Sequence, residues 1–131
     1  MMRKDHWSQG TYEYLTIIHD IGHALSLARA HDSHEMPAAF DDVRYTIMSY
    51  NNNDHQIARW MNGQLVHYGA YTPMAYDIHA AQYLYGANPT TEFGATTYTF
   101  APSIPRVQAL YDTGGIDALF LAVSHCAVLL I

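Results

Sequence analysis

The most regular pattern of apolar residues lies in residues 11–30. Apolar side chains recur there about once per helical turn, at Leu15, Ile18, Leu25 and Leu27. Ser8 or Thr11 can cap the beginning of a helix, and Glu13 lies in its first turn, where a negative charge is favourable. The pattern predicts a long helix over residues 11–30.

A second helix is predicted over residues 74–85. Pro73 stands at its entry and Gly86 at its exit, the positions that these two residues favour around a helix. Its apolar residues keep a period of about 3.6. The two helices are expected to pack through one shared set of side chains, namely Leu15, Ile18, Leu25, Ile78, Ala81 and Leu84.

The remaining chain is expected to combine loops and short strands. Residues 31–45 are rich in Asp, Ser and Pro and predict a surface loop. Residues 54–72 fit neither a helix nor a strand clearly. Further on, the composition favours short strands over residues 96–100, 106–111 and 118–123. The predicted fold class is therefore α+β, mainly helical.

Composition and charge narrow the class of protein. The chain has 131 residues, a length typical of one domain, and half of them are hydrophobic. Its formal net charge of −6 argues against nucleic acid or an anionic membrane as a partner. The single cysteine, Cys126, excludes an internal disulfide, and no run approaches the ~20 apolar residues that span a bilayer. Residues 1–8 lack an apolar run, so no amino-terminal signal peptide is expected there.

Candidate chemistry begins with two of the nine histidines. His19 and His23 are one helical turn apart, so the second ring is rotated only ~40° from the first. Both Nε2 atoms could then reach one cation at about 2.0–2.1 Å. Asp20 follows the first histidine, where zinc peptidases hold an acid that takes a proton from water. Taken alone such a pair is a weak indication, because an exposed pair of helical histidines is the commoner interpretation.

Four segments in one order carry a resemblance to a known family. Residues 17–32 read IIHDIGHALSLARAHD, similar to the pattern HEIGHALGLxHPGD, and residues 46–50 read TIMSY, similar to the Met-turn pattern SIMSY or SLMSY. Residues 77–88 read DIHAAQYLYGAN and resemble DIAAIQxLYGAN, while residues 111–117 read YDTGGID and resemble WDAGGND. These patterns are those of the serralysin family of metzincin metallopeptidases, and the resemblance spans roughly residues 8–124.

The resemblance implies a secreted, zinc-dependent endopeptidase that hydrolyses peptide bonds of protein or peptide substrates through zinc-activated water. His19 and His23 would be zinc ligands, and Asp20 would stand in the general-base position. Met48 would form the hydrophobic floor beneath the metal. Tyr50 would be the tyrosine that can ligate zinc and then stabilise the developing oxyanion.

The chain departs from the family pattern at three positions. Asp20 stands in place of a glutamate; its carboxylate reaches about 1.5 Å less far, and misplacing a catalytic group by ~1 Å can cost on the order of 100-fold in rate. Ser26 replaces a glycine that turns the chain out of the helix, so the helix is expected to continue. Arg29 falls where the third zinc ligand is expected, and a guanidinium cannot ligate zinc. From a continued helix His31 could not reach the metal, whereas a turn at Ser26 would let His31 or His34 substitute.

The resemblance also predicts how the chain is divided. Residues 1–95 would be part of a metzincin-like zinc peptidase catalytic domain, and residues 96–131 a truncated start of a calcium-binding β-roll. Asp117 would be a candidate Ca²⁺ ligand there, although a simple turn is the other interpretation of its segment. The chain looks like a fragment or a degenerate member of the family.

Two functions stay open at this point. One is a zinc endopeptidase with weak metal binding, and the other is a catalytically inactive remnant that lacks the third zinc ligand and the amino-terminal sheet. Family members use a carboxy-terminal export signal, so an extracellular location is expected on the resemblance. The sequence leaves the oligomeric state and the cleavage preference open.

Overall fold

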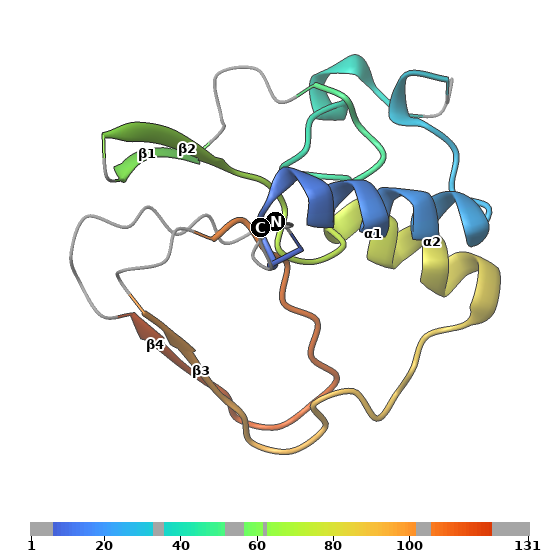
Figure 1. The fold of residues 1–131 in the computed structure, drawn as a ribbon. Helices are drawn as coiled ribbons and strands as arrows, with labels where there is room; N and C mark the ends of the chain where they lie inside the picture. The colour runs from blue at the N-terminus through green and yellow to red at the C-terminus, as the bar shows by residue number, and fades with distance from the viewer. Residues whose placement is uncertain (1–6, 33–35, 52–56, 62, 102–105, 122–131) are drawn as a thin grey trace.

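A computed structural model describes residues 7–32, 36–51, 57–61, 63–101 and 106–121 (Figure 1). Its elements, in chain order, are helix α1 (Tyr12–Ala24), 3₁₀ turns at Ala30–Asp32 and Ala38–Phe40, strands β1 (Ile57–Met61) and β2 (Gln64–Tyr68), helix α2 (Ala75–Tyr85), and strands β3 (Thr97–Phe100) and β4 (Ala118–Leu121). The α+β class is confirmed. Within the described residues the two α-helices have 13 and 11 residues.

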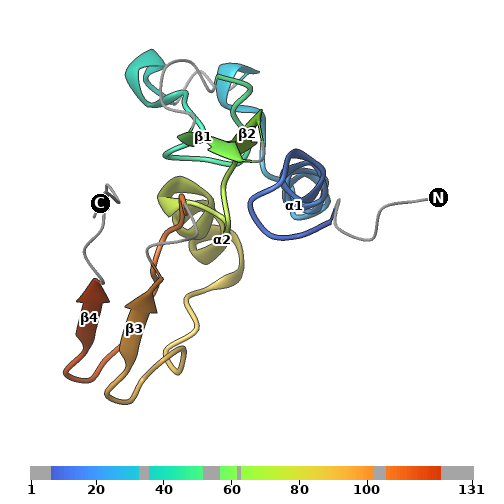
Figure 2. The same cartoon turned by 60° about the vertical axis from the view of Figure 1, so that its left-hand side comes forward.

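The two helices lie side by side and run in the same direction (Figures 1 and 2). Where they end, the hydroxyl of Tyr85 donates a hydrogen bond of 3.1 Å to the carbonyl of Leu25. The buried core gathers around their facing sides and the segment between them, and consists of Ile18, Leu27, Ile47, Met48, Ala70 and Met74. This core therefore packs residues 46–48 directly against both helices.

Helix α1 begins as predicted but ends earlier. The hydroxyl oxygen of Thr11 accepts a hydrogen bond of 3.3 Å from the N–H of Tyr14, which makes Thr11 the amino-terminal cap. The helix ends at Ala24, so the predicted continuation to residue 30 is wrong. Ser26 instead adopts a left-handed conformation with φ of 65°, and the chain turns there.

The turn at Ser26 has a clear physical cause. The N–H of Ser26 donates to the carbonyl of His23 at 2.9 Å, and the N–H of Leu27 donates to that of Gly22 at 3.0 Å. These two bonds form the Schellman motif, which satisfies carbonyl groups that a helix end would leave without partners. The motif also buries Leu27, which is only 9% exposed. Together these gains outweigh the cost of ~1 kcal/mol that a non-glycine residue meets at positive φ.

Helix α2 matches its prediction within one residue at each end. Gly86 follows it with φ of 86°, and its N–H donates to the carbonyl of Gln82 at 2.8 Å. Of the side chains predicted to join the helices, Ile18 is buried and Leu15 packs against the core. Leu25 and Leu84 are 40% and 49% exposed, so their assignment to the core was wrong. Both stand at or beside the carboxy-terminal ends of the two helices.

The strands form two separate pairs among the described residues. In the segment 54–72 that sequence left undecided, β1 and β2 form an antiparallel hairpin in which Ile57 pairs with Tyr68 and Met61 with Gln64. Strands β3 and β4 pair in parallel, with Thr97 opposite Ala118, and lie away from the helices in both views (Figures 1 and 2).

Two of the predicted strands after residue 95 are present. The predicted strand 96–100 is β3, and β4 is the first part of the predicted strand 118–123, of which residues 122 and 123 lie outside the described ranges. The predicted strand 106–111 was wrong: it is reduced to a single bridge between Val107 and Ala70. No helix within the described part of the chain is long and apolar enough to cross a membrane.

Candidate metal centre

The two histidines of α1 lie together, as their spacing predicts. The centroids of the His19 and His23 rings are 4.7 Å apart, and the rings are nearly perpendicular. His19 is only 8% exposed. Because residues four apart share one face of a helix, the local fold of α1 alone is enough to bring these two imidazoles together.

The Nδ1 atom of each ring contacts a backbone carbonyl. His19 Nδ1 lies 2.7 Å from the carbonyl oxygen of Ile47, and His23 Nδ1 lies 3.2 Å from that of Leu27. A carbonyl can only accept, so each Nδ1 carries the proton and each Nε2 keeps its lone pair. Histidine ligands in metal proteins are oriented in this way, with the second ring nitrogen donating to a carbonyl or carboxylate.

The Nε2 atom of His23 is a buried polar atom that hydrogen-bonds to no other described residue. A buried acceptor without a partner is unfavourable unless something else satisfies it. A cation at this position would do so. The buried imidazole nitrogen is therefore an observation of this fold that fits a metal ion with nitrogen ligands.

A sharp bend of the chain, residues 46–50, lies against α1 between the two histidines; we call it the methionine bend. Met48 is 2% exposed. A Cβ atom added to Gly22 would lie 2.5 Å from the sulfur of Met48, closer than two such atoms can approach. Gly22 thus lets the methionine bend pack directly on the helix that carries the histidines.

Asp77 of α2 holds the methionine bend in place. Its carboxylate accepts hydrogen bonds from the hydroxyl of Thr46 at 2.6 Å, from the N–H of Ile47 at 2.8 Å and from the N–H of Met74 at 2.8 Å. Burial raises the pKa of Asp77 above its ordinary value, while these three hydrogen bonds act in the opposite direction. Asp77 is thereby connected to the site, because the carbonyl of the same Ile47 orients the ring of His19.

Sequence reasoning missed this role of Asp77. The residue opens the third family match, at residues 77–88, but the sequence analysis assigned it no role. The pattern could have pointed to it, since a carboxylate in the first turn of a helix that follows an apolar segment has backbone N–H groups within reach.

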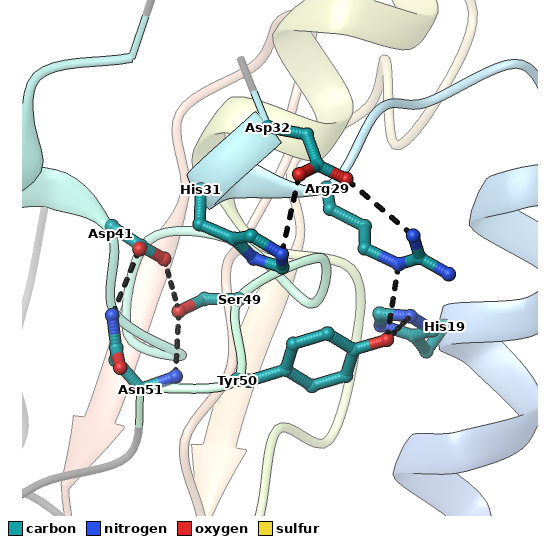
Figure 3. Close-up of polar contacts among 8 residues, drawn as sticks. All are labelled: His19, Arg29, His31, Asp32, Asp41, Ser49, Tyr50 and Asn51. Atoms are coloured by element: carbon teal, nitrogen blue, oxygen red, sulfur yellow. Dashed lines mark hydrogen bonds and ion pairs between the residues drawn. The ribbon is translucent and has the colours of Figure 1, made fainter. Parts of the chain in front are cut away.

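Tyr50 ends the methionine bend and reaches the histidines. Its hydroxyl lies 3.3 Å from His19 Nε2, and its ring is 60% exposed (Figure 3). Asp41 fixes the backbone on either side of it, because its carboxylate accepts from the hydroxyl of Ser49 at 2.6 Å and from the side-chain amide of Asn51 at 2.8 Å. The phenol is therefore the third donor group beside the two imidazoles.

Arg29 also reaches this cluster. Its Nε donates to the hydroxyl of Tyr50 at 3.3 Å, and its Nη1 lies 3.5 Å from a carboxylate oxygen of Asp32 (Figure 3). The hydrogen bond with Tyr50, ahead of the bond with Asp32, raises the pKa of Arg29 above its already high ordinary value. The guanidinium is thus a permanent positive charge next to the position that a metal would take.

The other candidate residues lie at the edge of this cluster or away from it. Asp20 is exposed, and its carboxylate makes no hydrogen bond or ion pair with another described residue. The ring of His31 is centred 5.5 Å from that of Tyr50, and its Nε2 lies 3.4 Å from Asp32. His34 lies outside the described residues. Among the residues that are described, no three side chains of His, Cys, Asp or Glu gather to hold a metal ion, so His31 is not brought in as a third ligand.

The calcium candidate Asp117 directly precedes β4. Its carboxylate accepts a hydrogen bond of 2.9 Å from the N–H of Thr96, just before β3. Near it, Asp112 accepts from the hydroxyl of Tyr98 at 2.7 Å, which raises the pKa of Tyr98 to about 12. These bonds close the loops around β3 and β4. Calcium binding at Asp117 stays a prediction.

Paired helical imidazoles that pack on a methionine bend form an arrangement that could hold a metal ion. The chain is 40% identical to serralysin of Proteus mirabilis, 35% identical to serralysin C of Dickeya chrysanthemi, and 33% identical to metallopeptidase AprA of Pseudomonas marginalis. Each alignment covers 82% of this chain. It covers 25%, 26% and 27% of the respective relative, so the chain spans about a quarter of the length of the curated relatives it matches. No family model matches the chain. Over the aligned stretch the chain belongs to the serralysin family.

Proposed function

We propose that the protein is a zinc-dependent metalloendopeptidase of the serralysin type, which acts outside the cell on protein or peptide substrates. The observation that carries the proposal is the pair of imidazoles on α1. Both have Nδ1 bonded to a backbone carbonyl, and the Nε2 of His23 is buried without a partner in the described structure. The names of the relatives, serralysin and metallopeptidase AprA, support the same class.

The proposed roles follow from where the side chains lie. His19 and His23 would hold the zinc ion, which when bound supplies a Lewis acid that polarises the peptide carbonyl and lowers the pKa of water. Asp20, next to His19 in the chain and exposed to solvent, would take the proton from the attacking water. The hydroxyl of Tyr50 would donate a hydrogen bond to the charge that develops on the carbonyl oxygen.

The same resemblance supports a wider proposal for the architecture. Residues 1–95 would be part of a metzincin-like catalytic domain, and residues 96–131 the start of a β-roll. The parallel pairing of β3 with β4 and the bond from Thr96 to Asp117 support this division. A calcium ion at Asp117 would be part of that β-roll.

A second candidate is a catalytically inactive member of the family. Arg29 favours it, because its guanidinium lies on Tyr50 and adds a positive charge where a zinc ion would need a third ligand. The shorter carboxylate of Asp20 favours it as well. In this case the chain would keep the fold of the site without turnover.

Zinc content after dialysis, together with casein hydrolysis in the presence and absence of a chelator, separates the two candidates. A metallopeptidase gives about one zinc per chain and cleavage that the chelator stops. Both should be lost in His19→Ala and His23→Ala and kept in His79→Ala, which removes an exposed histidine from α2. A chain that folds but retains no zinc, or whose cleavage ignores the chelator, would rule out the peptidase and leave the inactive member.

A further inference from the structure

Arg29 presents more hydrogen-bond donors at the metal centre than its neighbours use. A guanidinium carries five N–H donors in a planar fork. Nε donates to Tyr50 at 3.3 Å, while the contact of Nη1 with Asp32 is 3.5 Å, the far limit of a hydrogen bond. Nη2 has no partner among the described residues, and the side chain is 47% exposed. The fork is therefore open to a ligand from solvent.

Asp32 and Tyr50 flank this fork. Asp32 is the one described carboxylate in contact with Arg29, and it is shared with His31, whose Nε2 lies 3.4 Å away. On the other side, Figure 3 shows the phenol of Tyr50 between the guanidinium and the ring of His19. Among the described residues in contact with it, the guanidinium therefore faces a single exposed carboxylate, at 3.5 Å.

We propose that Arg29 makes the edge of this site a receptor for a carboxylate, namely the free carboxyl terminus of a bound peptide. A guanidinium fork matches the two oxygens of a carboxylate and binds them with paired, charge-assisted hydrogen bonds. The contact with Asp32 competes weakly with such a ligand, because its length of 3.5 Å is at the far limit of a hydrogen bond. The hydroxyl of Tyr50 keeps the fork oriented while the outer donors bind.

The position of the fork favours a terminal carboxylate. Only two hydrogen-bond lengths, both 3.3 Å, connect Arg29 Nε through Tyr50 to His19 Nε2. One residue of peptide spans at most ~3.3–3.6 Å, so a terminal carboxylate on Arg29 would leave the last one or two peptide bonds beside the imidazoles. That consequence for cleavage rests on the proposed function. Binding of the carboxylate itself needs neither metal nor turnover.

The test uses the full chain, freed of metal by a chelator, and isothermal titration calorimetry. The probes are an acetylated tripeptide with a free carboxyl terminus, the same tripeptide as its amide, an amide-capped tripeptide with an internal aspartate, and acetate. The variants are Arg29→Gln and Arg29→Lys, with Arg44→Gln as the matched control. Arg44 pairs with Asp42 at 3.0 Å, and in the described structure it bonds to neither His19 nor His23, so this change removes the same charge elsewhere.

We expect the free acid to bind about tenfold more tightly than the amide. This difference should vanish in Arg29→Gln, shrink in Arg29→Lys, which keeps the charge without the fork, and persist in Arg44→Gln. Equal binding of acid and amide, or an equal loss in Arg44→Gln, would overturn the site. If the internal aspartate or acetate binds as tightly as the free acid, the assignment to a peptide terminus is wrong. Because no metal is present, none of these outcomes depends on whether the protein hydrolyses peptides.

Discussion

Among single residues, Arg29 is the one whose charge bears most directly on the candidate metal centre, because it bonds to Tyr50 beside the two histidines. Its guanidinium cannot ligate zinc and adds a positive charge. It also donates a hydrogen bond of 3.3 Å to the hydroxyl of Tyr50. The two imidazoles are oriented without its help, since their Nδ1 atoms bond to carbonyls of Ile47 and Leu27. The two candidate ligands are thus oriented as a metal site would need, with a permanent positive charge nearby.

Replacing Arg29 should strengthen metal binding. Arg29→His removes a permanent charge and adds a nitrogen ligand, so we expect the affinity for zinc to rise by at least about tenfold. Adding Asp20→Glu and Ser26→Gly, to restore the family pattern, should not reverse this gain. The measurement is a competition titration against a chromophoric chelator, with Arg44→His as the control for charge alone. An unchanged affinity in Arg29→His would mean that the imidazole pair does not form a zinc site.

A second prediction concerns Asp77, which is buried and accepts three hydrogen bonds. Asp77→Asn should lower the free energy of unfolding by about 1–3 kcal/mol at pH 4. Both oxygens of Asp77 accept hydrogen bonds, whereas the side-chain NH₂ group of asparagine is a donor and would leave at least one of these donors without an acceptor. Burial raises the folded-state pKa of Asp77 above its ordinary value of 3.8. Its favourable contribution is then fully present below 3.8 and is lost as the pH rises through the raised pKa.

The gap in stability between the protein and Asp77→Asn should therefore narrow as the pH rises from 3.8. Urea denaturation of both proteins at a series of pH values measures this gap, and subtracting the two profiles removes the titration of groups they share. A gap that widens with pH would show that the hydrogen bonds, rather than burial, set the pKa of this carboxyl.

For the helices and strands, the decisive feature is the end of α1. The sequence predicted its beginning, its histidine face and the whole of α2, because caps and apolar periodicity are local properties. The predicted continuation of α1 past Ser26 was wrong. That prediction used only the unfavourable positive φ of a serine, and the sequence does not reveal the two Schellman hydrogen bonds or the burial of Leu27 that compensate for it. The hairpin of β1 and β2 was not predicted for a related reason. It forms through hydrogen bonds between residues 57–61 and 64–68, and these contacts between strands are not visible in the local sequence pattern.

The strain at Ser26 gives a prediction for this element. Ser26→Gly should raise the free energy of unfolding by about 0.5–1 kcal/mol, because glycine adopts a φ of 65° without the steric cost that serine meets. Ala28→Gly, at an exposed position two residues on, serves as the control and should bring no gain. Urea midpoints at constant slope measure both. A loss of stability in Ser26→Gly would mean that the serine side chain contributes more than its backbone conformation costs.

At the scale of the whole molecule, the exposed side of α1 stands out. Ile17, Ile21 and Leu25 follow one another at intervals of one turn and are 39%, 52% and 40% exposed. An apolar stripe of this kind favours association between proteins. We therefore expect the protein to associate as its concentration rises.

A charge in that stripe should prevent the association. Ile21→Lys is expected to keep the protein monomeric over the range in which the original chain associates, without loss of fold, since the side chain is half exposed. Sedimentation velocity at several concentrations is the measurement, and Thr16→Lys, at an exposed polar position of the same helix, is the control. Equal association of both variants would place the contact on another surface.

The whole-molecule arrangement also explains what the sequence could say about the candidate site. His19 and His23 follow from one helix, so their proximity was predictable. Asp77 acts through contacts between α2, the methionine bend and α1, and Arg29 reaches Tyr50 only because the chain turns at Ser26. Neither contact follows from periodicity, because each joins residues from separate elements.

The left-handed serine has one more effect, on where a proton resides. The turn it creates brings the carbonyl of Leu27 back toward the helix, where it lies 3.2 Å from His23 Nδ1. The tautomer of that imidazole therefore depends on the backbone angle of a residue three positions later. The ¹⁵N chemical shifts of the His23 ring depend on this tautomer. They would therefore report whether the chain turns at Ser26 or the helix continues past it.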